Sequence, residues 1–304
     1  MTQFSDIEDA GKRLTQVGYL PSRDISTSAF LMDRLEKPVL IEGPAGVGKT
    51  EVARALATSL GRELLRLQCY EGLDESKALY EWEYAKQLLY TQLLKDKIGE
   101  LMTGAGSIKD AAERVAASDA VFFSERFLLP RPILQALMSP TPAVLLIDEI
   151  DKADPEFEAF LLQVLAENAV TVPELGTIKA KHVPRVVLTS NNARELSDAL
   201  KRRCLHLYID YPTRERELAI VRSRLPGVPE KLAAQVVNAV SKLRGLELKK
   251  APSIAETLDW AQALVLLNAD TLSAELVAQT LTLVVKHEGD VQKAKANLHA
   301  LVTA

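Results

Sequence analysis

The sequence predicts an α/β protein in which a parallel β-sheet is followed by a smaller all-helical domain. Three continuous apolar runs alternate with helical segments: Pro38–Glu42, Ala143–Ile147 and Val186–Thr189. Strands of this kind are covered on both faces, which is typical of parallel sheets. After Tyr211-Pro212 only helix-like segments follow. We therefore expect an α/β domain over residues 1–211 and a helical domain over residues 212–304.

Each element of the first domain is expected from its hydrophobic period and from the Gly or Pro residues around it. The segment Ile98–Phe123 carries Gly99, Gly104 and Gly106 among residues of mixed polarity, so we expect an irregular insertion there. The other expected elements, in chain order, are helices Ser5–Gln16 and Ile25–Leu35, strand Pro38–Glu42, helix Lys49–Leu60, strand Leu64–Cys69, a long helix Asp74–Lys97, strand Ala143–Ile147, helix Pro155–Glu167, a hairpin of Val170–Thr177 with Lys179–Val183 around Gly176, and strand Val186–Thr189.

The second domain shows helix-like segments with Pro or Gly between them. These are Arg214–Leu225, Glu230–Leu243, Ile254–Leu267 and Ser273–Val302. A separate helical domain from about residue 212 is the simplest interpretation of this change in pattern.

Composition and charge argue against several classes of protein. The 304 residues include 37 basic and 41 acidic side chains, and this net charge of −4 disfavours a surface that wraps nucleic acid. The N-terminus lacks the basic and apolar segments of a signal peptide, and no apolar run approaches the ~20 residues of a membrane span, so we expect a cytoplasmic protein without membrane contact. Cys69 and Cys204 are expected to be reduced and buried, with no disulfide or zinc site.

The most specific motif is a glycine-rich loop between an expected strand and an expected helix. Gly43–Thr50, which we call the phosphate loop, matches the pattern G-x-x-x-x-G-K-[ST]. The glycines let consecutive backbone N–H groups point at a phosphate, and the following helix adds its positive N-terminal end. Lys49 then reaches the β- and γ-phosphates while the Thr50 hydroxyl ligates Mg²⁺. The expected nucleotide-binding residues are Gly43, Pro44, Ala45, Gly46, Val47, Gly48, Lys49 and Thr50.

Two carboxylates, Asp148 and Glu149, close the apolar run that ends at Ile147. They are expected at the carboxyl edge of the sheet, where open α/β folds bind ligands. Asp148 can hold the Mg²⁺ coordination shell, and Glu149 can polarise an attacking water. A carboxylate pair after a strand is often only a helix cap or a solvated turn, but together with the phosphate loop it predicts hydrolysis of a nucleoside triphosphate.

These residues resemble the AAA+ ATPases and, within them, the MoxR group. Leu145–Ala153 is similar to the Walker B segment of that family, and Gly43–Thr50 to its Walker A segment. Asn191 falls on the sensor 1 position, where a polar side chain can hydrogen-bond the attacking water or the γ-phosphate. The resemblance covers nearly the whole chain. It implies an AAA+ P-loop NTPase core with a helical lid over residues 212–304, and ATP with Mg²⁺ as ligands.

The segment Asp198–Leu205 resembles the stretch that supplies the arginine finger of AAA+ rings. Arg203 falls on the usual position and Arg202 lies beside it, whereas the alternative is a basic helix end favoured by the helix dipole. Arginine suits a finger because it stays charged and presents a planar fork to phosphate oxygens. Since a finger acts on a neighbouring subunit, the resemblance implies a homo-oligomer in the form of a hexameric ring.

The lid departs from the MoxR pattern at one position. MoxR-like proteins usually carry a sensor 2 arginine in a Ser-Pro-Arg-like segment, but the matching stretch here is Pro252–Thr257, with Ala255 at the arginine position. Either sensor 2 is missing, or another basic residue such as Arg244 or Lys250 replaces it.

Further segments resemble narrower groups. Asn168–His182 fits the hairpin that MoxR-like proteins place before sensor 1, and the long stretch between the Walker segments leaves room for their helix 2 insert. Ala78–Tyr84 and Phe123–Leu128 are similar to the CoxD-like branch, whose members accompany carbon monoxide dehydrogenase and related molybdenum hydroxylases. Three aromatic side chains alternate in the first of these segments and fit either core packing or a partner-binding site: Tyr80, Trp82 and Tyr84.

The resemblance implies a ring-forming ATPase chaperone that remodels a protein client in metal-cofactor maturation. The client would be a metalloenzyme or a von Willebrand factor A-domain adaptor. A DNA-handling AAA+ motor is one alternative, but the net charge of −4 does not indicate the basic surface that it needs. A nucleotide-dependent regulatory switch is another: Glu149 and the two arginines disfavour it, while the missing sensor 2 arginine favours it.

Overall fold

The computed structural model describes residues 3–93, 127–173 and 175–303. These residues form a five-stranded sheet in the order β2-β5-β8-β1-β9, and every neighbouring pair is parallel. The strands are β1 (Val39–Glu42), β2 (Leu64–Gln68), β5 (Val144–Asp148), β8 (Arg185–Ser190) and β9 (Leu205–Tyr208). The expected parallel α/β architecture is therefore confirmed.

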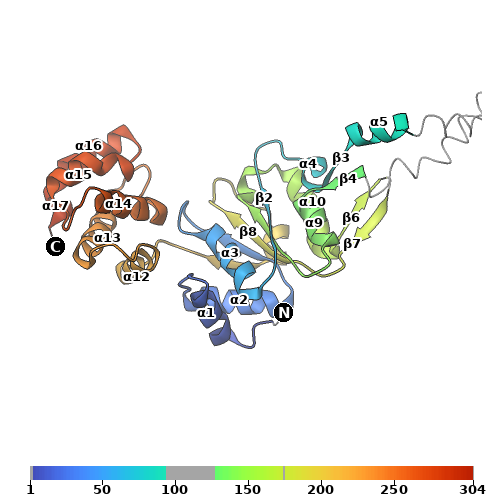
Figure 1. Cartoon of the computed structure of the whole chain (residues 1–304), viewed down its shortest axis with the longest axis horizontal. Helices are drawn as coiled ribbons and strands as arrows, with labels where there is room; N and C mark the ends of the chain where they lie inside the picture. The colour runs from blue at the N-terminus through green and yellow to red at the C-terminus, as the bar shows by residue number, and fades with distance from the viewer. Residues whose placement is uncertain (1–2, 94–126, 174, 304) are drawn as a thin grey trace, which may run out of the picture.

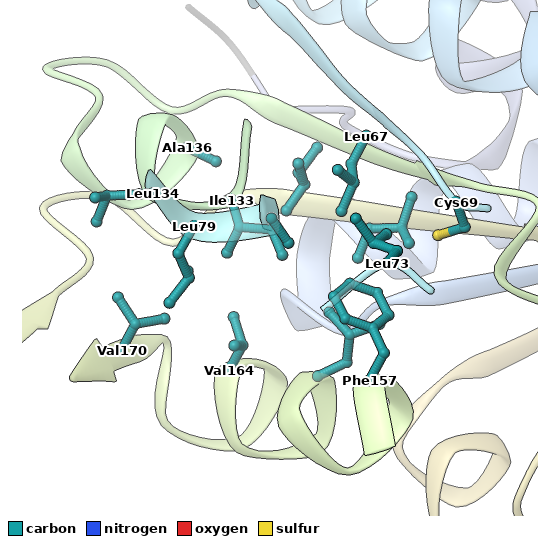
Figure 2. Packing of buried hydrophobic residues seen from close by; sticks show 14 of the residues in the cluster. Leu67, Cys69, Leu73, Leu79, Ile133, Leu134, Ala136, Phe157, Val164 and Val170 are labelled. Carbon is teal, nitrogen blue, oxygen red and sulfur yellow. The ribbon is translucent and has the colours of Figure 1, made fainter. Parts of the chain in front are cut away.

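Helices cover both faces of this sheet. The side chains of β5 alternate between two hydrophobic cores, with Leu145 and Ile147 in one core and Val144 and Leu146 in the other. The first core includes residues of α9 (Pro132–Met138) and α10 (Pro155–Glu167), as Figure 2 shows for Ile133 and Phe157. The second includes residues of α1 (Ile7–Gln16), α2 (Arg23–Leu35) and α3 (Lys49–Leu60). Coverage on both faces explains the unbroken apolar run of β5.

The expected long helix Asp74–Lys97 is interrupted by a strand. The chain forms α4 (Glu75–Leu79), β3 (Tyr80–Trp82) and α5 (Tyr84–Leu93). β3 pairs antiparallel with β4 (Leu128–Pro130), and this contact between distant segments overrides the local helical pattern. Residues 94–97 and the expected insertion Ile98–Phe123 lie outside the described residues.

The three alternating aromatic side chains do not share one environment. Trp82 is 8% exposed and meets Tyr80 edge to face, with ring centroids 5.8 Å apart. Tyr84 is 68% exposed and begins α5, which extends away from the sheet in Figure 1. Core packing therefore accounts for Tyr80 and Trp82, but not for Tyr84.

The expected hairpin is formed by β6 (Ala169–Val172) and β7 (Gly176–Lys179). Gly176 begins the second strand, so the turn precedes it and is not centred on it. A short helix, α11 (Asp198–Arg203), and the edge strand β9 were not among the expected elements. β9 is only four residues long and has exposed side chains at every second position, so its apolar pattern is weak.

The helices from residue 212 onward, which we call the helical lid, have a hydrophobic core of their own. They are α12 (Arg214–Arg224), α13 (Glu230–Arg244), α14 (Ile254–Leu266), α15 (Ala274–Thr280), α16 (Glu288–Ala296) and α17 (Leu298–Val302). The fully buried Trp260 donates a hydrogen bond from its Nε1 to Thr280 Oγ1 at 2.7 Å. The expected helix Ser273–Val302 is divided: α15 continues into a 3-10 helix at Leu281–Leu283, and the chain is not helical at Val284 and Val285, which lie in the lid core.

Both cysteines are free thiols. Cys69 is buried as expected, whereas Cys204 is only half-buried. Burial raises the pKa of each thiol to about 12, and nearby carboxylates add to this effect at Cys69. Within the described ranges, no helix combines the length and the apolar character needed to cross a membrane.

Candidate functional site

The carboxyl edge of the sheet gathers the chemically distinctive residues. β5, β8 and β1 are consecutive in the sheet, and each leads into one of the segments singled out in the sequence. The phosphate loop follows β1, Asp148 ends β5 and Asn191 follows β8. Parallel strands thus bring three distant parts of the chain to one place, at the edge where α/β proteins bind ligands.

The phosphate loop has a backbone shape that requires glycine. Gly43, Gly46 and Gly48 have φ angles of +148°, +76° and +94°. A Cβ on Gly43 would lie 1.9 Å from the carbonyl oxygen of Ile209, and a Cβ on Gly46 would lie 2.2 Å from Ser253 Cβ. Gly48 is the N-cap residue of α3 and has no side chain to accept from the first N–H groups of this helix. The loop is therefore shaped to present its backbone to an anion.

Lys49 joins the phosphate loop to the segment that follows β8. Its Nζ donates three hydrogen bonds of 2.7 Å, to the carbonyl oxygens of Gly43 and Pro44 and to Asn191 Oδ1. The residue is only 6% exposed. Burial lowers the pKa of Lys49, while the neighbouring carboxylates, Asp151 foremost, act in the opposite direction. The ammonium is held at the point where a bound phosphate would need a positive charge.

Thr50 and Asp148 form a pair of oxygen donors. Thr50 Oγ1 lies 3.1 and 3.3 Å from the two carboxylate oxygens of Asp148. Asp148 is 2% exposed and also accepts hydrogen bonds from Thr189 Oγ1 at 2.5 Å and from Arg66 at 2.6 Å. Sequence reasoning missed Arg66, although a charged residue in an otherwise apolar strand was a usable signal.

This pair fits Mg²⁺, which prefers hard oxygen ligands and usually takes only one or two from the protein, with water and substrate phosphates completing its shell. The described residues include no cluster of three or more His, Cys, Asp or Glu side chains that could hold a metal ion without substrate. The donor set therefore suits a cation that arrives with a phosphate group.

Glu149 and Asn191 lie in contact beside that pair. Glu149 has a left-handed backbone, with φ +57°, a conformation that is uncommon outside glycine and concentrated at functional sites. Its Oε1 accepts a hydrogen bond from Asn191 Nδ2 at 3.3 Å. Its Oε2 accepts from Gln68 Nε2 at 2.9 Å and pairs with Lys152 Nζ at 2.6 Å. The carboxylate that we expect to polarise water is thus held by three neighbouring side chains.

Asp151 is a further buried carboxylate that sequence reasoning did not assign to the site. Its Oδ2 accepts hydrogen bonds from the backbone N–H groups of Asn191 and Ala193, at 3.1 and 2.9 Å. It is 4% exposed, and its Oδ1 has no partner among the described residues. Asp151 therefore fixes the backbone of the segment that carries Asn191.

A cavity of about 460 Å³ extends from these residues to the helical lid. It is lined by residues 45–50 of the phosphate loop together with Asp148, Glu149 and Asn191. It is also lined by residues 18–20, between α1 and α2, and by residues of α12 and α14. Gly43 and Pro44 shape the loop but do not line the cavity. Its volume is in the range of small-molecule sites.

Ala255 lines this cavity, at the position where the sequence lacks the sensor 2 arginine. Neither of the replacements suggested by sequence lines it. Arg244 binds both carboxylate oxygens of Glu217 at 2.6 and 2.9 Å, and Lys250 pairs with Glu256 at 3.3 Å. The two arginines of the lid that do line the cavity are both on α12: Arg216 and Arg224.

Arg202 and Arg203 are not part of this arrangement within one chain. Both are exposed at the C-terminal end of α11, and neither lines the cavity. Among the described residues, neither guanidinium has a hydrogen-bond or ion-pair partner. The structure therefore brings together every other predicted site residue and leaves these two at the surface.

Comparison with known proteins agrees with this geometry. Residues 38–204, more than half of the chain, match the AAA domain of the dynein-related subfamily. The chain belongs to this AAA family. The MoxR-type AAA+ resemblance that the motifs indicated is thereby supported, and the AAA segment spans the phosphate loop, the carboxylates and Asn191.

Three relatives of this AAA+ chain differ in how much of their own length they share with it. Chaperone protein ClpB 2 of Parasynechococcus marenigrum is 31% identical over 51% of the chain and 13% of its own length. Gas vesicle ATPase GvpN of Haloferax mediterranei is 27% identical over 68% of the chain and 56% of its own length. Protein NorQ of Paracoccus denitrificans is 25% identical over 75% of the chain and 73% of its own length. The chain thus spans a small part of the first relative and about half of the second.

Proposed function

We propose that this AAA+ protein binds and hydrolyses ATP with Mg²⁺, assembles as a hexameric ring, and uses ATP to remodel a protein client. One observation supports the ATPase part most strongly: residues that end or follow three neighbouring strands line one ligand-sized cavity. We also propose an α/β nucleotide-binding domain over residues 1–211 and a lid domain over residues 212–304. The separate core of the helical lid supports this division.

Each side chain then has a distinct task. The phosphate loop and Lys49 hold the terminal phosphates in place for attack, and positioning accounts for much of catalysis in this chemistry. Thr50 and Asp148 would hold Mg²⁺, which neutralises charge on the phosphate oxygens. Glu149 polarises the attacking water as a general base, and Asn191, whose amide touches that carboxylate, orients the same water or the γ-phosphate.

The ring is supported by the position of two arginines. Arg202 and Arg203 are exposed on α11 and do not reach the cavity of their own chain. We propose that Arg203, with Arg202 beside it, reaches the γ-phosphate bound by a neighbouring subunit. A guanidinium in this position stabilises the charge that develops on the transferred phosphoryl group.

The client part of the proposal is supported by the similarity to a chaperone and by the exposed apolar side chains of α5. A relative that matches half of the chain is named a chaperone. Helix α5 exposes large apolar side chains, with Tyr84 68%, Leu88 60% and Leu89 53% exposed, which suits contact with a protein. On the resemblance to the CoxD-like branch, we propose a metalloenzyme of the molybdenum hydroxylase type, or a von Willebrand factor A-domain adaptor, as the client.

The ATPase part can be tested with two substitutions and a surface control. Lys49→Ala should abolish ATP binding measured by calorimetry, whereas Lys231→Ala, an exposed lysine of α13, should bind ATP like the parent. Glu149→Gln should bind ATP but lose Mg²⁺-dependent turnover by about 10²-fold or more, because an amide cannot accept the proton. ATP binding by Lys49→Ala at parental affinity would contradict the proposal.

The client part needs a separate readout. Glu149→Gln rings loaded with ATP should retain the client in a pull-down, and Lys49→Ala rings should not. A nucleotide-dependent switch without turnover is favoured by Ala255, which leaves α14 without a cation at the cavity. This alternative predicts that the parent protein shows no Mg²⁺-dependent turnover and behaves like Glu149→Gln.

A further inference from the structure

Among the described residues of the helical lid, the charged side chains that line the cavity are on α12. Four residues of α12 line it at spacings of four, three and one, which places them on one face of the helix: Arg216, Ile220, Ser223 and Arg224. The cavity-lining residues of α14 are Ile254, Ala255 and Leu258, none of which is charged. Any positive charge that the lid offers to a ligand in this cavity therefore comes from α12.

Arg216 is committed to the loop between α1 and α2. Its guanidinium donates a hydrogen bond to the carbonyl oxygen of Leu20 at 2.9 Å, and Leu20 itself lines the cavity. The neighbouring Tyr19 is on the same loop. Arg216 thus ties the lid to one wall of the cavity and acts as a positioning residue.

Arg224 has a looser attachment beside the phosphate loop. It pairs with Glu51 Oε2 at 3.1 Å, and Glu51 also pairs with Arg54 through its other oxygen at 3.2 Å. The side chains of Arg224 and Glu51 are 46% and 40% exposed, and exposed pairs of this kind contribute little and exchange readily. Glu51 follows Thr50 in the first turn of α3, where phosphates bind to the helix N-terminus.

We propose that Arg224 exchanges the Glu51 carboxylate for a phosphate oxygen of the bound nucleotide, so that α12 supplies the nucleotide contact that α14 lacks. This inference rests on the proposed ATP binding and names a further residue of that same site. A guanidinium can hold a phosphate with two parallel hydrogen bonds, whereas Arg224 makes a single contact of 3.1 Å with Glu51, and Glu51 keeps Arg54 as a partner after the exchange. The bound nucleotide would then connect the phosphate loop to the lid through Arg224.

A simpler role must be separated from this one. Arg224 could merely neutralise Glu51, and its removal would then weaken ATP binding because an unpaired carboxylate remains near the phosphates. The two roles differ in the Glu51→Gln background, where there is no carboxylate left to neutralise. If Arg224 contacts phosphate, its removal must still weaken binding in that background.

The experiment measures dissociation constants of ATP, ADP and adenosine by calorimetry for Glu51→Gln, with and without Arg224→Ala. We expect the double variant to bind ATP and ADP about 10-fold more weakly than Glu51→Gln, because a hydrogen bond to a charged group is lost. Adenosine, which has no phosphate, should bind equally to both. Arg222→Ala is the matched control, since Arg222 is on the same helix but pairs with Glu230 and does not line the cavity.

Each outcome bears on one proposal or both. Equal ATP affinity of the two Glu51→Gln variants would overturn the role of Arg224, and so would an equal loss of affinity for adenosine. If the parent binds ATP in a Lys49-dependent manner, such a result leaves the proposed function standing. Failure of the parent to bind ATP would overturn both. Circular dichroism and retained adenosine binding show that a weakened variant is still folded.

Discussion

Replacing Gly46 by alanine should force the phosphate loop and the helical lid apart. The added Cβ would lie 2.2 Å from Ser253 Cβ and 2.8 Å from its Oγ. Relaxed carbon contacts are at about 3.5–4.0 Å, so one segment has to move by more than ~1 Å. The backbone hydrogen bond from Ile254 N to Gly46 O, at 3.2 Å, spans the same contact and should break.

The cost can be divided into two parts by a matched variant. Gly48 also has a positive φ, but a Cβ there would meet nothing within 4 Å. Gly48→Ala should therefore show the backbone strain alone, about 1–2 kcal/mol. Gly46→Ala should show that strain plus an overpacking term of about 1–3 kcal/mol. The difference between the two variants measures the contact with Ser253.

A double variant tests whether Ser253 is the cause. Ser253→Gly removes the clashing atoms and costs only a few tenths of a kcal/mol as a change of the N-cap residue of α14. In combination with Gly46→Ala, it should recover most of the stability that overpacking removes. The two substitutions should therefore show a coupling energy of about 1 kcal/mol or more. If the lid instead moves away as a unit, the clash should lower the affinity for ATP and not the stability. The same double variant should then restore the affinity for ATP.

Stability is measured by urea unfolding in a Trp82→Phe background, where the fluorescence of the buried Trp260 reports on the lid. ATP affinity is measured by calorimetry on the four proteins of the double-mutant cycle: the parent, Gly46→Ala, Ser253→Gly and their combination. Additive effects of the two substitutions in both measurements would refute the contact between the phosphate loop and the lid.

Two further expectations concern assembly and thiol chemistry. Arg203→Ala should bind ATP but lose turnover by a factor on the order of 10³. Mixing it with Lys49→Ala subunits should restore part of the activity, because an intact ATP site then meets an intact arginine. Mixed rings that stay inactive, although native mass spectrometry confirms their co-assembly, would rule out a finger acting between subunits. Because the pKa of both Cys69 and Cys204 is raised to about 12, little thiolate is present at pH 8. Ellman's reagent should therefore label the folded protein far more slowly than the urea-unfolded chain. Equal labelling rates would show that the thiols are accessible.

Local sequence signals were sufficient where a cap or a proline defines an element. α3 and α10 begin and end at the expected residues, since Gly61 caps the end of α3 and Pro155 begins α10. The long helix expected from Asp74 failed because β3 exists only through its pairing with β4, some fifty residues away. A strand of three residues that is stabilised by a distant partner is too short to show a recognisable hydrophobic period in its own sequence.

The same distinction applies to the candidate site. Lys49 and Asp148 could be placed from sequence because each belongs to a motif at the carboxyl end of an expected strand, and Asn191 was placed by its resemblance to the sensor 1 position. Arg66 was missed because its contact with Asp148 depends on the register of β2 against β5. Arg224 was missed because it reaches the cavity only through the way the lid packs on the core, which no local motif encodes.

The hydrogen bonds of Lys49 have a consequence for the order of events at the site. An ammonium group can donate three hydrogen bonds, and Lys49 uses all three. A terminal phosphate oxygen can take one of them only by displacing an acceptor, and the amide of Asn191 is the acceptor that can rotate without deforming the phosphate loop. Because the same amide also donates to Glu149 Oε1, its rotation would remove one of the three contacts of that carboxylate, while those with Gln68 and Lys152 remain. Arrival of the terminal phosphate would thus be coupled, through the side chain of Asn191, to a change in the surroundings of the carboxylate that we propose to activate water.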